Sequence, residues 1–181
     1  LCINNNPATI LVTTGSLTSM TDVTHLCHFD IPLLSGIPNL IYLAPTNKEE
    51  YLAMLDWSID YKEHPVAIRV PVGKTISANR KVERDFSNLN KYETVLEGED
   101  VAILALGNFF SLGECVAQEL EAKHIHATLI NPRYISGIDT QLMEALKFNH
   151  RLVVTLEDGA LEGGFGEKIA RYFGPSQMKV A

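Results

Sequence analysis

The sequence has little of what marks secreted, membrane-spanning or nucleic-acid-binding proteins. Its 181 residues include only three cysteines, Cys2, Cys27 and Cys115, an odd number whose wide spacing does not suit a disulfide framework. No apolar run is long enough to span a membrane, and no signal-type segment opens the printed sequence. The net charge of −7 argues against a nucleic-acid partner. We therefore expect a cytoplasmic protein, in which a local cationic pocket for a small anion is still possible.

Apolar runs of strand length alternate with stretches of helix length, which is typical of the α/β fold class. The hydrophobic share of 46% is enough for one large domain or two small ones. Strand-like runs lie at 8–14, 40–44, 66–70, 92–96, 101–106, 127–130, 152–156 and from 178 onward. Helices are predicted from a Thr46–Glu49 capping box to about Asp60, and near 110–123, 139–147 and 163–172. This order predicts mostly parallel sheets covered by helices on both faces.

The alternation changes character in the middle of the chain. Residues 72–91 are dominated by Gly, Lys, Arg and Asn, with few apolar anchors, and we interpret them as a linker on the surface. The linker divides the chain into a first α/β unit, 1–71, and a second, 92–181. Both printed ends fall close to strand-like runs, so we expect the chain to be a piece of a longer protein.

The segment Asp22–Asp30 has the highest concentration of side chains that can transfer a proton or bind a ligand, because it contains two imidazoles, a thiol and two carboxylates. It follows one parallel-type strand and precedes the next, which places it at the carboxyl edge of a sheet. His25 is the leading catalytic candidate, since an imidazole with a pKa near neutrality can transfer a proton or hold a hydroxyl; the alternative is a loop histidine bonded to backbone. His28 and Cys27 lack a second pair of metal ligands, so no metal site is predicted.

Arg69 ends a strand that should be buried, and a buried guanidinium needs an anionic partner. The planar fork suits a substrate phosphate, but a salt bridge to Asp30 or Glu63 explains the position equally well. Asp30 precedes a short apolar turn with Pro32 near its start, which predicts a helix N-cap.

Two further features lie near the end of the chain. Gly163–Gly166 separates a strand from a helix, where such a turn can bind phosphate, although close packing of strand and helix explains the glycines better. Glu157 and Asp158 end the preceding strand, where solvated acids are the default interpretation and acids that face an interdomain or subunit surface are the alternative.

The order of several short motifs resembles 1-deoxyxylulose-5-phosphate synthases, a family of transketolase-like enzymes. In the first unit the matching pieces are Thr24-His25-x-x-x-Phe29-Asp30, Ile37-Pro38-Asn39-Leu40, Leu43-Ala44-Pro45-Thr46 and Val66 to Pro71. In the second unit they are Asn131 to Ile135, Asp139, Leu152 to Asp158 and Gly163 to Gly166. Each motif is short, but the series covers nearly the whole chain in order.

The resemblance implies a reaction in which pyruvate condenses with glyceraldehyde 3-phosphate and releases carbon dioxide. It implies a catalytic role for His25 and substrate binding by Arg69 and Asp30. It also implies thiamine diphosphate and Mg²⁺ in the complete enzyme, and a homodimer. The domain that binds the diphosphate and the metal has no counterpart in this sequence, so no cofactor-binding residue is assigned. The missing N-terminal part is thus an implied partner, and the chain alone is expected to be inactive.

Three alternatives stay open at this stage. Two are enzymes of the same class, a transketolase and the β-subunit of a 2-oxoacid dehydrogenase E1 component. The third is a non-catalytic assembly or dimerisation module. The segment from Thr24 to Asp30 favours the synthase within the class, whereas the missing cofactor residues favour the assembly module for the isolated chain.

Overall fold

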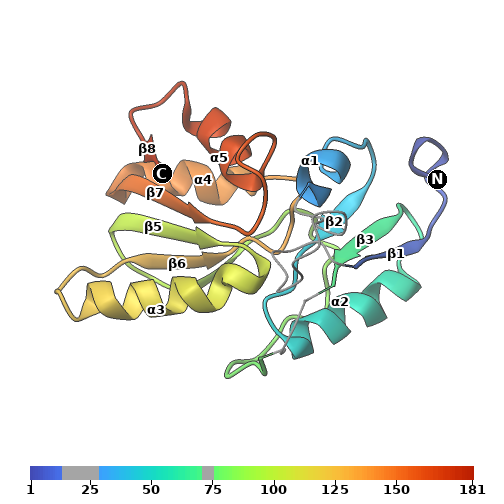
Figure 1. Ribbon diagram of the computed structural model, residues 1–181, viewed down its shortest axis with the longest axis horizontal. Coiled ribbons are helices and arrows are strands. Elements are labelled where there is room, and N and C mark those ends of the chain that lie inside the picture. The colour runs from blue at the N-terminus through green and yellow to red at the C-terminus, as the bar shows by residue number, and fades with distance from the viewer. Residues whose placement is uncertain (14–28, 71–75) are drawn as a thin grey trace, which may run out of the picture.

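The first unit is a small parallel sheet with a helix on each face (Figure 1). A computed structural model describes residues 1–13, 29–70 and 76–181. After a short 3₁₀ turn, Cys2–Asn4, strands β1 (Thr9–Val12), β3 (Val66–Arg69) and β2 (Ile41–Leu43) pair in that order. Helix α2 (Lys48–Asp60) covers one face and the short helix α1 (Asp30–Leu34) lies on the other. All pairings are parallel, as the buried β-branched runs predict.

The second unit is a larger sheet with helices on both faces (Figure 1). Its strand order is β4 (Glu93–Leu96), β6 (Thr128–Asn131), β5 (Asp100–Ala105), β7 (His150–Leu156) and β8 (Lys179–Val180). A 3₁₀ turn, Gly107–Phe109, leads into α3 (Phe110–Glu121), which packs on one face; α4 (Thr140–Asn149) and α5 (Phe165–Phe173) cover the other. Only β4 is antiparallel, so the described sheets are mostly parallel and the predicted α/β class is confirmed.

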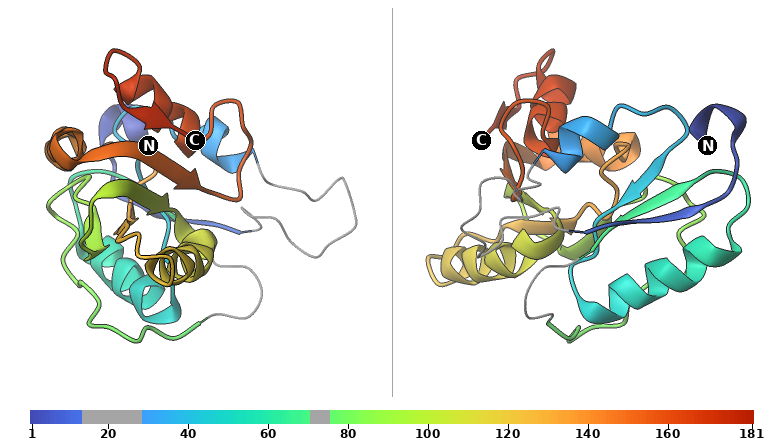
Figure 2. Two further views of the ribbon diagram at one scale, coloured as in Figure 1. Left: turned by 90° about the vertical axis from the view of Figure 1, so that its left-hand side faces the viewer. Right: turned by 45° about the vertical axis from the view of Figure 1, so that its right-hand side comes forward.

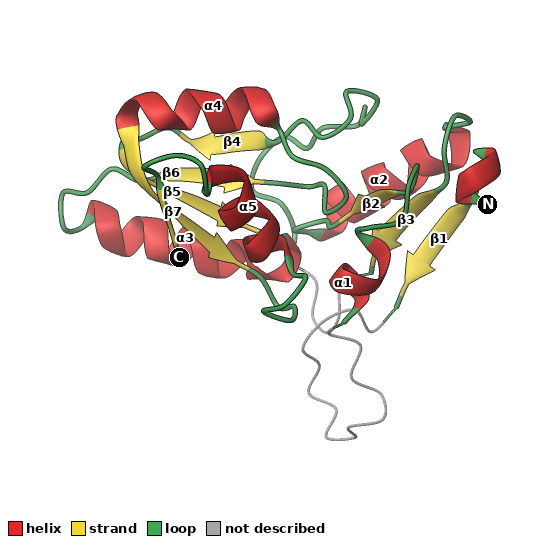
Figure 3. Cartoon of the chain, turned by 90° about the horizontal axis from the view of Figure 1, so that it is seen from above, coloured by secondary structure: helices red, strands yellow, loops and turns green. Residues whose placement is uncertain are grey.

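The two units share one hydrophobic core. A single cluster of buried side chains runs from Tyr42 and Ile68 in the first unit to Leu104 and Phe165 in the second. Backbone bonds also cross between the units: the N–H of Ala44 donates to the carbonyl of Arg133 at 2.7 Å, and the N–H of Ile135 donates to the carbonyl of Tyr42 at 2.7 Å. The strands of the two sheets point toward each other, so their carboxyl edges converge between the units, as Figures 2 and 3 show.

The segment interpreted as a surface linker is anchored at its described end. Residues 76–91 form no helix or strand, as predicted, but the ring of Phe86 is only 2% exposed and joins the shared core. Phe86 meets Trp57 edge to face, and its carbonyl accepts a hydrogen bond from the hydroxyl of Tyr134 at 2.7 Å. The segment is therefore fixed between α2 and the second unit by one large apolar side chain.

The start of α2 differs by one residue from the predicted capping box. The N-cap is Asn47, whose side-chain oxygen accepts a hydrogen bond from the N–H of Glu50 at 2.8 Å. Glu50, not Glu49, reaches back to the N–H of Thr46, at 2.7 Å. The carboxylate of Glu50 is buried and also accepts hydrogen bonds from Asn131 and Arg133, so tertiary contact with the second unit decides which glutamate turns inward.

Candidate functional site

The described part of the candidate site is a buried group of charges at the meeting of the two sheet edges. Arg69, the last residue of β3, holds Asp30 through two bonds, Nε to Oδ2 at 2.8 Å and Nη2 to Oδ1 at 3.0 Å. Its Nη1 donates to the carboxylate of Asp158, which follows β7. The hydroxyl of Tyr42 donates to Asp30 on the other side. This Arg69 cluster therefore consists of one guanidinium, two carboxylates and one phenol.

All members of the Arg69 cluster are shielded from water. The side chains of Arg69, Asp30 and Asp158 are 5%, 4% and 1% exposed. Burial alone lowers the pKa of Arg69, but the charges of Asp158 and Asp30 outweigh burial and raise it. Burial, with the charge of Asp30 next, raises the pKa of Tyr42 far above its ordinary value. The guanidinium therefore stays charged and the phenol stays protonated across the physiological range.

Of the two explanations for a buried Arg69, the structure shows the salt bridge to Asp30. It also adds a partner that sequence reasoning missed, since Asp158 was expected to be a solvated acid and is instead nearly fully buried. The default interpretation of a solvated acid is therefore wrong for Asp158, whereas the alternative of an interdomain position agrees with the structure, because the carboxyl edge of β7 faces the first unit. The guanidinium of Arg69 makes four hydrogen bonds to Asp30 and Asp158. A phosphate can therefore bind Arg69 only if it displaces one of these two residues.

The prediction that Asp30 is the N-cap of α1 is wrong. The N-cap position is Phe29, which makes no side-chain capping bond, and Asp30 is the first helical residue. Its carboxylate is committed to Arg69 and Tyr42 instead. A charged pair in a buried site outweighs the weaker preference of a carboxylate for orphan amides at a helix start.

His25, the leading catalytic candidate, lies outside the described residues, as do Cys27, His28 and the rest of 14–28. The residues on either side of this segment are described: β1 ends before it, and Asp30 of the Arg69 cluster follows it. Glu63, the other proposed partner of Arg69, is exposed and interacts with the hydroxyl of Tyr61 at 3.3 Å.

The glycine-rich turn before α5 serves packing and capping. The carboxylate of Glu157 accepts hydrogen bonds from the N–H groups of Phe165 at 3.0 Å and Gly166 at 2.9 Å. A Cβ on Gly164 would lie 2.3 Å from the carbonyl oxygen of Ala160, and one on Gly166 would lie 2.7 Å from the hydroxyl oxygen of Thr155. Glu157 therefore occupies amides that a phosphate would use, which supports the packing interpretation of the glycines.

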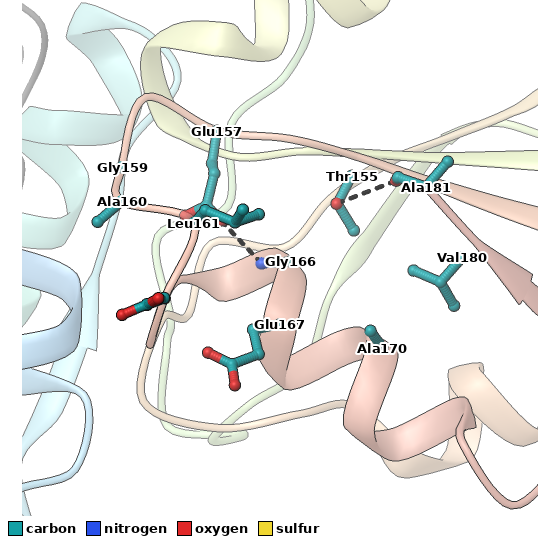
Figure 4. Close-up of a pocket in the computed structure, with 11 residues that line it drawn as sticks. Thr155, Glu157, Gly159, Ala160, Leu161, Gly166, Glu167, Ala170, Val180 and Ala181 are labelled. Atoms are coloured by element: carbon teal, nitrogen blue, oxygen red, sulfur yellow. Dashed lines mark hydrogen bonds between the residues drawn. The ribbon is translucent and has the colours of Figure 1, made fainter.

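A cavity of about 720 Å³ lies beside this turn, between the end of β7 and α5 (Figure 4). Its wall combines the end of β7, the loop 159–162, one face of α5 and the chain's last two residues. Glu157, Glu162 and Glu167 contribute three carboxylates, and Leu161, Ala170 and Val180 supply apolar surface. Because carboxylates repel a phosphate, this cavity is a poor fit to a phosphorylated substrate.

The described residues contain neither a membrane-spanning helix nor a cluster of metal ligands. No helix there is long and apolar enough to cross a membrane. Within residues 1–13, 29–70 and 76–181, no group of three or more His, Cys, Asp or Glu side chains is placed to hold a metal ion.

Comparison with known proteins defines the class. Residues 90–179 match the family described as transketolase, C-terminal domain. A solved structure of a split-gene transketolase, described as an inactive beta4 tetramer, matches with a TM-score of 0.80 at 24% identity, over 100% of this chain and 58% of that chain. That structure shows the same fold across both units. Residues 90–179 therefore belong to the transketolase C-terminal domain family, and the chain as a whole has a transketolase-like fold.

The curated relatives carry a more specific name. The 1-deoxy-D-xylulose-5-phosphate synthase of Alkaliphilus oremlandii is 36% identical over 180 residues, which is 98% of this chain and 28% of that protein. The synthases of Clostridium perfringens and Acidobacterium capsulatum are 35% and 33% identical over 95% and 93% of this chain. The chain spans just over a quarter of the length of these relatives. The resemblance read from the motifs is therefore confirmed along nearly the whole chain.

Proposed function

We propose that this chain is the C-terminal part of a thiamine-diphosphate-dependent transferase of the 1-deoxy-D-xylulose-5-phosphate synthase type. In this proposal the complete protein condenses pyruvate with glyceraldehyde 3-phosphate and releases carbon dioxide. The observation that carries the proposal is the similarity to synthases of that name over 93–98% of the chain. The transketolase-like fold of both units supports it but does not select the reaction.

Two of the three site residues of the proposal, Arg69 and Asp30, belong to the Arg69 cluster. His25 is assigned the catalytic role of moving a proton or holding a hydroxyl near the reacting carbonyl. Arg69 and Asp30 are assigned to substrate binding. The substrate phosphate displaces Asp158 from Nη1 of Arg69, while the two bonds to Asp30 keep the fork oriented. The position of Asp30, five residues after His25, supports this arrangement.

Thiamine diphosphate and Mg²⁺ belong to the complete enzyme in this proposal. The cofactor supplies the carbanion chemistry, and the protein binds and orients the substrates. The described residues do not fit a magnesium–diphosphate site, because no three metal-ligating side chains are grouped among them. No step is therefore assigned to the cofactor or the metal through residues of this chain.

Turnover by the complete protein tests the function. Carbon dioxide release from pyruvate should require glyceraldehyde 3-phosphate, thiamine diphosphate and Mg²⁺ when this chain is part of its full-length parent. The isolated chain should show neither turnover nor sub-micromolar binding of thiamine diphosphate by calorimetry. A complete protein that consumes no pyruvate would refute the proposal, and an active isolated chain would refute the assignment of the cofactor to the missing part.

Replacing Arg69 by Lys tests the phosphate assignment. Lysine keeps the positive charge but loses the planar fork, so the KM for glyceraldehyde 3-phosphate should rise while the KM for pyruvate changes little. Steady-state kinetics that vary each substrate separately measure both values. Arg151→Lys is the matched control, because the side chain of Arg151 is 81% exposed. If Arg69→Lys leaves the kinetics for the sugar phosphate unchanged, the salt bridges of Arg69 are its whole role.

A second candidate function is an assembly module, favoured by the fold match to a split-gene transketolase described as an inactive beta4 tetramer. Under both candidates we expect the chain to self-associate, since β1 is an edge strand of the sheet as far as the structure describes it, and its Leu11 is 46% exposed. Light scattering of the isolated chain should show a dimer or larger, and a monomer across the micromolar range would contradict this. Restored turnover when the missing N-terminal part is added separates the transferase from a module that only assembles.

A further inference from the structure

A second, smaller cavity of about 280 Å³ lies between the two units, at the opposite end of α1 from Asp30. Pro32, Ser35 and Gly36 form its wall on the side of the first unit. On the side of the second unit the wall consists of Gly163 and Gly164 in the turn before α5, and of Glu167, Lys168 and Arg171 along α5. These two cations are three positions apart on α5 and therefore lie on the same helix face.

Within the part of the chain that the structure describes, neither Lys168 nor Arg171 forms an ion pair with a carboxylate. Among the described residues, Lys168 has one polar partner, the carbonyl of Ile135, to which its Nζ donates, and no ion pair involves Arg171. Burial, followed by the nearby charge of Arg171, lowers the pKa of Lys168 to about 8. Two like charges thus face one cavity, where an anion would stabilise both.

Two acids lie at or near the cavity: Glu167 belongs to its wall, and Glu157 acts on Lys168 from nearby. Glu167 accepts the N–H of Gly163, and Glu157 accepts the N–H groups of Phe165 and Gly166. Glu157 also acts on Lys168 through its charge, but more weakly than burial and Arg171 do. Because Glu157 already caps the first turn of α5, the positive character of the cavity comes from side chains and not from the helix amides: the two cations in the wall outnumber the one carboxylate, that of Glu167.

We propose that this cavity is a binding site for a small oxyanion of the phosphate class, held by Lys168 and Arg171, with the hydroxyl of Ser35 as a further donor. Lysine supplies a compact charge and arginine a planar fork, which together suit a tetrahedral anion. The anion joins α1 to α5 and thereby holds the two units together. The site is separate from the Arg69 cluster and stands independently of the proposed transferase function.

Inorganic phosphate is the probe, compared with chloride at matched ionic strength to remove general screening. Phosphate should raise the melting temperature of the wild-type chain, because a ligand that binds only the folded state stabilises it. The rise should be lost in Lys168→Met and in Arg171→Gln. Lys123→Met is the control, since Lys123 is exposed after α3, and this variant should respond as the wild type does. An equal phosphate response in Lys168→Met would overturn the proposal.

A second measurement needs no variant and so does not depend on how a variant folds. Acetylation of each lysine by a water-soluble reagent is followed by mass spectrometry near pH 8, where the amine of Lys168 is partly unprotonated and reactive. Phosphate should slow acetylation of Lys168 several-fold, because an adjacent anion raises the pKa of an amine and shields it. Lys123 should be unaffected. Equal rates at Lys168 with and without phosphate would refute the site.

Discussion

The side chain of Arg69, at the end of β3, donates to the carboxylate of Asp158, which lies 89 positions later in the chain. This bond joins the first unit to the second beside the carboxyl edges of both sheets. Asp30 completes the group on the side of the first unit with two further bonds. The cluster thereby connects Asp30, the last residue of the Asp22–Asp30 segment, to the second unit. Any movement of one unit against the other must therefore break or rearrange the Arg69 cluster.

Removing the guanidinium should destabilise the fold strongly. Arg69→Met leaves Asp30 and Asp158 buried without a cation, and breaking a buried pair in this way costs about 3–5 kcal/mol. Urea unfolding followed by circular dichroism measures the loss. Arg151→Met is the matched control, because the Arg151–Asp100 pair is 81% and 56% exposed, and such pairs contribute about 0–1 kcal/mol. Equal losses in the two variants would show that the Arg69 cluster is not a stabilising element.

A methyl group added at Gly113 should destabilise the second unit. A Cβ there would lie 2.6 Å from the Cβ of Ala105 and 3.1 Å from Cδ1 of Leu129, so α3 must move away from the sheet. Overpacking of this kind costs about 1–3 kcal/mol, which exceeds the gain of roughly 1 kcal/mol in helix propensity. Gly36→Ala is the control, because nothing lies within 4 Å of a Cβ at that position. A Gly113→Ala chain that melts no lower than Gly36→Ala would contradict this packing.

Acid should weaken the fold through His150. Burial lowers the pKa of His150 below its ordinary value of 6.5, and its Nε2 lies 2.8 Å from the hydroxyl of Thr128, which also accepts the N–H of Gly98. Below pH 6.5 the unfolded chain takes up this proton more readily than the folded chain. The stabilising contribution is therefore complete above pH 6.5 and is lost as the pH falls through the lower pKa of the folded state.

Urea unfolding at a series of pH values across 6.5 measures this effect. His150→Asn should flatten the pH dependence of the unfolding free energy below 6.5, whereas the same substitution at exposed His124 should leave it unchanged. Asparagine suits the control position, because His124 has a φ of 62° and asparagine tolerates left-handed backbone. An unaltered profile in His150→Asn would show that the pH dependence arises elsewhere.

Much of the fold was predictable because buried parallel strands are continuous apolar runs. The runs at 101–106 and 152–156 correspond to β5 and β7, and Asp139 caps α4 where the predicted helix begins. The antiparallel direction of β4 was not predicted, since a half-exposed strand of four residues shows no direction in its sequence. Phe86 was missed because a single aromatic residue among polar neighbours carries no periodic signal.

The candidate site was less predictable than the fold. The position of Arg69 at a strand end indicated a buried cation that needs an anion, and Asp30 was named as one possible partner. Asp158 was missed because its pairing depends on how the two units dock, which local pattern does not encode. The same dependence on tertiary contact explains why Glu50, and not Glu49, turns toward the second unit. His25 remains a prediction from motif and resemblance, since it lies outside the described residues.

The most direct test of the proposed function is turnover by the complete protein with His25 replaced by Ala. Loss of a proton transfer or hydrogen bond in the transition state should lower kcat for the condensation of pyruvate with glyceraldehyde 3-phosphate by about 10²-fold or more. His126→Ala serves as the control, because that histidine is exposed after α3, and it should turn over at the wild-type rate. If His25→Ala retains normal kcat, the Asp22–Asp30 segment is a scaffold and the catalytic assignment is wrong.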